Sequence, residues 1–106
     1  GKKILDEEDI WRHVFQTGLD FTGACIGTEG ASALARRFPG KLNKLSLDVS
    51  ECFLGSAGLR ALGDALLQTK DVTSLHLDVS RNGLGEDDVR QHLHLPQQVR
   101  RLEFGL

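Results

Sequence analysis

Two stretches of the chain, Lys44–Gly55 (KLSLDVSECFLG) and Ser74–Gly85 (SLHLDVSRNGLG), carry the same pattern 30 residues apart. In each, Leu, Leu and Val occupy alternate positions, and polar residues occupy the positions between them. An alternation with a period of two is typical of a strand that buries one of its faces. The two stretches therefore predict equivalent strands near 45–50 and 75–80, each followed by a turn that ends in Leu-Gly.

Looser copies of this pattern lie on either side of the two clear ones. One copy begins at Thr17, 28 residues before Leu45, and the other places Leu102 27 residues after Leu75. They predict further strands near 17–22 and 102–106. Four copies at nearly constant spacing indicate an internal repeat, and this repeat identifies the fold more strongly than any single residue.

Between the predicted strands the apolar spacing becomes helical. Leu59, Leu62 and Leu66 stand at positions i, i+3 and i+7, which place them in one stripe on a helix. Corresponding segments end at Pro39 and near Pro96, because proline does not continue a helix. The predicted helices lie near 28–38, 56–68 and 86–95.

Repeated strand–turn–helix units predict an α/β solenoid, in which neighbouring units stack because none can bury its apolar face alone. We expect a short curved stack over 17–106, with parallel strands on the concave side and helices on the convex side. Residues 1–16 do not follow the repeat and are expected to form an N-terminal capping helix, whose acidic start suits a helix N-terminus. Trp11 is expected to cover the first strand, and the alternative is an anchor for a partner.

The pattern Leu-x-x-Leu-x-Leu-Asp-Val-Ser-x-(Cys/Asn)-x-Leu-Gly, followed by a helix of small residues, resembles the leucine-rich-repeat family. The unit length and the helix entry look most like its ribonuclease-inhibitor-like class. The resemblance covers roughly 14–106. It implies that Cys52 and Asn82 point inward and satisfy backbone groups of the turn, with Ala24 in the equivalent place of the first copy.

The two cysteines, Cys25 and Cys52, are too few for a small secreted domain held by disulfides. We expect both to be free thiols and the protein to lie in an intracellular, reducing compartment. The net charge of −2 gives no basis for nucleic-acid binding, which requires clustered basic residues. No apolar run approaches the roughly 20 residues that span a bilayer.

The sequence predicts no enzyme, no cofactor and no metal site. Nucleophile, base and orienting group cannot be assembled from it, and its glycines fall at repeat turns rather than in phosphate-binding loops. His92 and His94 are two residues apart, so on a helix they would not face the same ligand. One alternative follows from the resemblance: the same repeat class includes activators of Ran-type GTPases, and Arg81 could contribute to such a role.

The polar residues of the strands are the candidate partner-binding residues. They are Asp20, Ser46, Asp48, Ser50, His76, Asp78, Ser80 and Glu103. Stacking the units places the three aspartates in one row and Ser46, His76 and Glu103 in another. The aspartate row is either an acidic patch for a basic segment of a partner, or a repeat feature in which each carboxylate bonds neighbouring hydroxyls. The remaining charges, among them Arg100 and Arg101, are expected on solvated outer faces and loops.

The last copy stops within its expected strand, at Leu102–Leu106. An open strand edge invites pairing with another chain. We therefore expect either a fragment of a longer solenoid or an edge that a partner covers. The function predicted from these features is a non-catalytic protein–protein interaction module or scaffold, which binds through its concave strands, its loops or this edge. The alternatives are a structural subunit of a larger assembly and a GTPase regulator.

Overall fold

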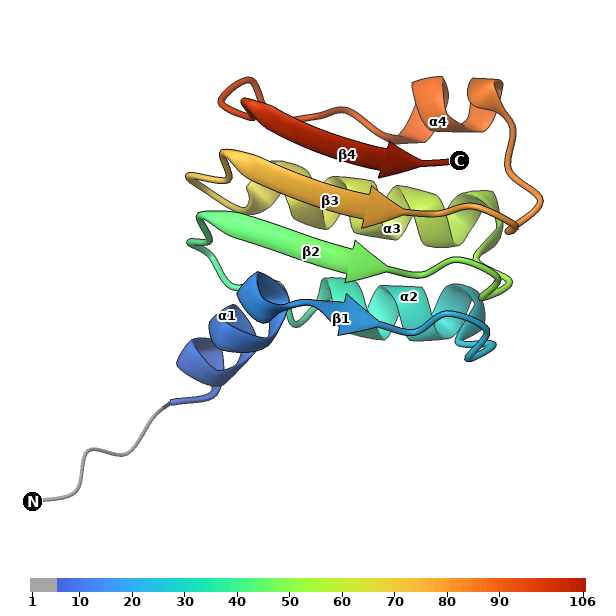
Figure 1. Cartoon of the computed structure of the whole chain (residues 1–106). Helices are drawn as coiled ribbons and strands as arrows, with labels where there is room; N and C mark the ends of the chain where they lie inside the picture. Colours follow the sequence, from blue (N-terminus) through green and yellow to red (C-terminus); the bar gives the residue numbers. More distant parts are fainter. Residues whose placement is uncertain (1–5) are drawn as a thin grey trace, which may run out of the picture.

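In the computed structural model, which describes residues 6–106, helices and strands alternate along the chain (Figure 1). The elements are α1 (Glu7–Thr17), β1 (Leu19–Asp20), α2 (Gly27–Ala35), β2 (Lys44–Asp48), α3 (Gly55–Gln68), β3 (Ser74–Asp78), α4 (Glu86–His92) and β4 (Arg101–Gly105). The strands form one parallel sheet in the order β1-β2-β3-β4. Helices α2, α3 and α4 lie behind the sheet in Figure 1. The predicted α/β repeat architecture is confirmed.

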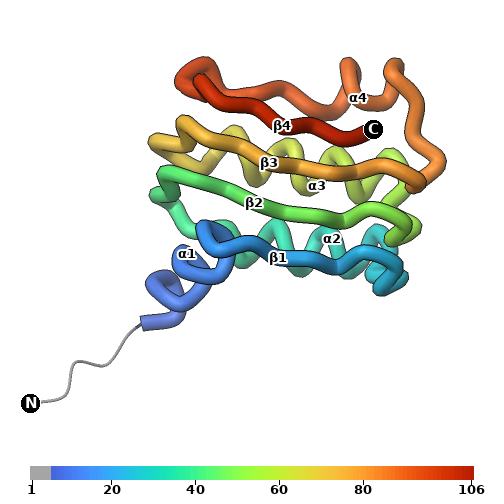
Figure 2. The backbone as a smooth tube through the Cα atoms, in the orientation of Figure 1, coloured from blue at the N-terminus to red at the C-terminus, as the bar shows by residue number. Residues whose placement is uncertain are grey.

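The core lies between the sheet and these helices, and the register of the strands builds it. Leu45 pairs with Leu75, and Leu47 pairs with Leu77, so equivalent residues of successive units stack. All four side chains are at most 3% exposed. Figure 2 shows the strands as successive rungs of one stack. A fully buried leucine contributes about 1.5–3 kcal/mol through the hydrophobic effect, so this stacking is the main source of stability.

The turn after each strand repeats a left-handed backbone at alternate residues. Glu51 and Phe53 have φ values of 53° and 58°, and Arg81 and Gly83 have values of 56° and 71°. A left-handed backbone is unfavourable for residues other than glycine, so bonds within the turn must hold it.

Asn82 joins its own turn to the turn of the preceding unit. Its Oδ1 accepts hydrogen bonds from the backbone N–H of Cys52 at 2.8 Å and of Leu54 at 3.1 Å. Its Nδ2 donates to the carbonyl oxygens of Val49 at 2.8 Å and Val79 at 3.0 Å. The inward position that the resemblance to leucine-rich repeats implies for Asn82 is therefore observed.

Cys52 takes the equivalent place one unit earlier. Its Sγ contacts the carbonyl oxygen of Phe21 at 2.8 Å, and the side chain is fully buried. Cys25 lies in the preceding turn and is exposed. Both thiols are free, as the low cysteine count predicts. Ala24, in the equivalent place of the first unit, is exposed.

Several boundaries differ from those predicted. Helix α4 ends at His92 rather than near residue 95, because Leu93 adopts an extended backbone (φ −117°, ψ 110°) and turns its side chain against the core. Helix α2 ends at Ala35, where tight turns close through the N–H groups of Arg37 and Phe38. Strand β1 has only two residues, and Gly18, which precedes it, has a φ of 126°.

Helix α1 covers the N-terminal end of the stack. It begins after Asp6, whose side chain accepts a bond from the Asp9 N–H at 2.8 Å. Phe15 is fully buried, and its ring centroid lies 4.7 Å from that of Phe38. Trp11 packs against the core and lines a hollow together with the connection from α2 to β2; that it covers the first strand stays a prediction.

Polar contacts fix α1 to the same connection. Glu8 Oε1 accepts from the Gly40 N–H at 2.9 Å, and Arg12 Nε donates to the Lys41 carbonyl at 3.0 Å. The guanidinium of Arg37 pairs with Glu7 and lies 5.9 Å from the ring centroid of Trp11. The helix is thus held by both packing and directional bonds. In the region predicted as a cap, 1–16, the structure has the helix Glu7–Thr17, and residues 1–5 lie outside those that the structure describes.

Candidate protein-binding surface

The side of the sheet away from α2, α3 and α4 is called the strand face here. It consists of the strand residues that alternate with the buried ones, namely Asp20, Lys44, Ser46, Asp48, Ser74, His76, Asp78, Arg101 and Glu103. The strand register arranges them in rows that cross the sheet. All of these side chains are half-buried or exposed, so the surface is accessible to another molecule.

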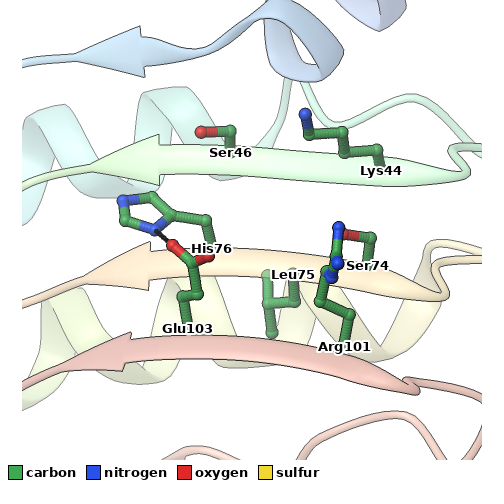
Figure 3. Close-up of a pocket in the computed structure, with 7 residues that line it drawn as sticks. All are labelled: Lys44, Ser46, Ser74, Leu75, His76, Arg101 and Glu103. Carbon is green, nitrogen blue, oxygen red and sulfur yellow. Dashed lines mark hydrogen bonds and ion pairs between the residues drawn. The ribbon is translucent and has the colours of Figure 1, made fainter.

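The two rows predicted from the sequence form as expected. Ser46 pairs with His76, which pairs with Glu103, and the second row runs from Asp20 through Asp48 to Asp78. In the first row, His76 Nδ1 lies 3.0 Å from Glu103 Oε2. Figure 3 shows the Glu103 side chain reaching from β4 toward the His76 ring on β3. This pair crosses the gap between two strands on the surface.

Each aspartate of the second row bonds to its own turn. The Oδ1 atom of Asp48 accepts from the Ser50 N–H at 3.0 Å and from the Ser50 hydroxyl at 2.7 Å. Asp78 accepts the same two bonds from Ser80, at 2.9 and 2.6 Å, and Asp20 accepts them from Thr22. The alternative in which each carboxylate bonds neighbouring hydroxyls is therefore observed.

At Asp78 the two bonds from Ser80 favour the ionised carboxylate. The hydroxyl of Ser80, followed by its backbone N–H, lowers the pKa of Asp78 below its ordinary value. Asp78 thus carries a negative charge at neutral pH, on the accessible surface.

Ser50 is a correction to the predicted site. Its side chain is only 2% exposed, and its hydroxyl bonds to Asp48 and, at 3.2 Å, to Thr22. It therefore supports the aspartate row from within and does not contact a partner. Ser80, its equivalent in the next unit, is half-buried and remains part of the accessible surface.

A third row, which the sequence did not single out, crosses the beginning of the strands. Lys44 pairs with Ser74, which pairs with Arg101. Arg101 is expected on a solvated outer face or in a loop; it is exposed, and it is the first residue of β4. The signal was present, because Lys44, Ser74 and Arg101 each stand two residues before a member of the Ser46 row.

The rows of Lys44 and Ser46 enclose a shallow hollow of about 240 Å³ (Figure 3). Its lining is polar except for Leu75. A depression with this lining offers hydrogen bonds and charge to a protruding side chain. It does not have the apolar walls that are typical of a pocket for a small molecule.

The outer edge of β4 presents a different kind of surface. Leu102 is 47% exposed and Leu106 is 48% exposed, although their equivalents in the preceding unit, Leu75 and Val79, are at most 1% exposed. In the part of the chain that the structure describes, no strand pairs with this edge. The edge thus combines unpaired backbone groups with exposed apolar side chains.

Within residues 6–106, no group of three His, Cys, Asp or Glu side chains could hold a metal ion. Over the same residues, every buried polar side-chain atom has a hydrogen-bond partner. None of the helices described is long and apolar enough to cross a membrane.

A family model described as "Leucine Rich repeat" matches residues 17–35, which include β1 and α2. The match supports the resemblance that the two clear repeats suggest, and it falls on the copy that follows the pattern least well. No curated protein and no solved structure matches the chain. Leucine-rich repeats generally serve as non-catalytic modules for protein–protein interaction, and this coarse assignment agrees with the open, polar strand face.

Proposed function

We propose that this protein is a non-catalytic interaction module that binds another protein through its strand face. One observation carries the proposal: the strand register brings three rows of polar side chains onto one accessible surface while the alternate residues form the core. Rigid strands hold these side chains in fixed positions, so a partner meets a preorganised surface.

The character of the strand face favours a macromolecular partner over a small molecule. Charges of both signs lie on it, at Lys44 and Arg101 and at the aspartate row. Its hollow is shallow and mainly polar. Such a surface gains specificity from electrostatic complementarity spread over a wide area.

A photo-crosslinking amino acid tests the binding surface. We would place it at Ser46, in the middle of the strand face, and in a matched protein at Arg60, which is exposed on α3. Proteins captured from the source cells are then purified, and their affinity for the chain is measured by calorimetry. We expect capture from Ser46 and not from Arg60.

The affinity measurement decides whether a captured protein is a partner. We expect Ser46→Arg to weaken binding of the purified protein by about tenfold or more, because a large side chain would occupy the hollow. Arg60→Glu should leave the affinity unchanged. Capture from Arg60 alone, or equal affinity of both variants, would contradict binding through the strand face.

The exposed edge of β4 favours a second candidate function, that of a subunit in a larger assembly. Burial of Leu102 and Leu106 by another protein would remove apolar surface from water and pair the free edge. If this is correct, the chain alone associates with rising concentration in sedimentation velocity, and Leu102→Glu combined with Leu106→Glu restores a monomer. A wild-type monomer at high concentration would contradict it. Regulation of a GTPase stays a prediction from the repeat class alone.

A further inference from the structure

We infer that the strand face is bipolar, and that it receives an extended protein segment whose acidic and basic side chains stand four residues apart. This inference rests on the proposed function, since it names the chemistry of the partner on the same surface. It depends on where the register places opposite charges along the strands.

The positive end of the strand face lies where the strands begin. Lys44 of β2 and Arg101 of β4 flank Ser74 of β3 in one row (Figure 3). Both basic side chains are exposed, and within residues 6–106 neither forms an ion pair. The row therefore offers two cations and one hydroxyl to an anionic side chain.

The negative end lies where the strands finish. The aspartates of β1, β2 and β3 stand side by side there, each held by bonds from the following Ser or Thr. Like charges in a row repel, so a cation placed over them is favourable. Glu103 lies between the two ends, and its Oε2 is 3.0 Å from His76 Nδ1.

The distance between the positive and negative ends of the strand face determines which partner conformation can reach both of them. Lys44 and Asp48 are four residues apart on one strand, which corresponds to about 13 Å along it. In an extended segment, residues four apart cover the same distance and point to the same side. On a helix the distance requires about nine residues, which lie on opposite sides. The charges therefore match an extended segment better than a helix.

A pair of synthetic peptides tests the inference directly. The first is a ten-residue Thr/Ser peptide with Glu at positions 2 and 4 and Arg at positions 6 and 8, so that each Glu has an Arg four residues on. The second has the same composition with Glu and Arg alternating at these positions. Titration of the labelled protein at low salt, followed by NMR, reports both affinity and location.

We expect the first peptide to bind more tightly than the second and to shift the amide signals of β2, β3 and β4. Lys44→Glu with Arg101→Glu should weaken its binding about fivefold or more, and so should Asp48→Asn with Asp78→Asn. Asparagine retains the Oδ1 acceptor, so the turns remain held. Arg60→Glu on α3 is the matched charge control and should have no effect.

Orientation gives an independent readout. A nitroxide at the Glu end of the first peptide should broaden signals near Lys44 and Arg101 and spare those near Asp78. Equal binding of both peptides, equal broadening at both ends, or equal weakening by Arg60→Glu would each overturn the inference. A purified partner captured from Ser46 whose affinity survives Lys44→Glu with Arg101→Glu would also overturn it, while the proposed function would stand.

Discussion

The two ends of the stack differ in how well their apolar side chains are buried. At the N-terminal end, α1 lies against the stack, and its Phe15 is completely buried. At the C-terminal end, Leu102 and Leu106 occupy repeat positions that are buried in the preceding unit, but they are nearly half exposed. Leu102 and Leu106 take the repeat positions of the buried Leu75 and Val79, so the difference between these two pairs lies in whether a further element covers them. In a solenoid, the contribution of an apolar residue is therefore set by its neighbours more than by its place in the repeat.

The largest effect is expected where α1 closes the stack. Phe15→Ala should lower the free energy of unfolding by about 3–5 kcal/mol, because it leaves a cavity beside Phe38 and detaches Trp11. Urea denaturation monitored by circular dichroism measures this loss in the free energy of unfolding. Leu106→Ala, at the open end, serves as the comparison and should cost less than about 1 kcal/mol. Equal losses would show that the two ends are equivalent.

The comparison can be made at one matched pair of repeat positions. Leu75→Ala should cost about 2–5 kcal/mol, whereas Leu102→Ala in the next unit should cost about 1 kcal/mol or less. The same denaturation experiment applies to both. A large loss at Leu102 would mean that its side chain is covered in solution, as association through the β4 edge would produce.

A smaller effect is expected at the turn that links two units. Asn82→Ala would leave the N–H groups of Cys52 and Leu54 without their acceptor, at a cost of about 1–3 kcal/mol. Asn82→Asp restores the acceptor but not the donor, and it should recover part of the loss in thermal denaturation. No difference between the alanine and aspartate variants would contradict the role of Oδ1.

The smallest effect concerns the charge of the aspartate row. Ser80→Ala removes the hydroxyl that most lowers the pKa of Asp78, so this pKa should rise toward the ordinary value of about 3.9. Because the pKa is lowered in the folded state, the associated stabilisation is present above the ordinary value and lost as pH falls through the folded one. The variant should therefore lose less stability on acidification.

An NMR titration of the Asp78 carboxyl carbon measures this shift. Ser50→Ala is the matched control, because Ser50 bonds to Asp48 and not to Asp78. It should leave the pKa of Asp78 unchanged. An equal change in both variants would indicate a general effect on the sheet instead of the local bond.

The fold could be predicted because the repeat is written twice in full. A period of two over 45–49 and its copy over 75–79 fix both the strands and their register, since only one alignment stacks both pairs of leucines at once. The Ser46 and Asp48 rows follow directly from that register. The resemblance to leucine-rich repeats also implied the inward position of Asn82.

The repeat pattern did not predict the burial of Ser50, the place of Arg101 or the end of α4, because turns and tertiary packing determine these features. Strict alternation predicts Ser50 outside, but the chain curls into the turn there and buries it. Arg101 follows Arg100, and two adjacent charges indicate only a solvated surface or loop. The strand register is what places Arg101 beside Ser74. Helix α4 ends early because Leu93 packs against the core, which periodicity alone does not specify.

The bonds of Asn82 and Cys52 have a consequence for cooperativity. Each side chain bonds to backbone groups of the preceding turn, so the second unit is joined to the first and the third to the second. Opening any inner unit would break hydrogen bonds that belong to the unit beside it. Loss of structure therefore proceeds inward from an end, and the amides of β2 and β3 should exchange with solvent together, as one unit, more slowly than those of β4.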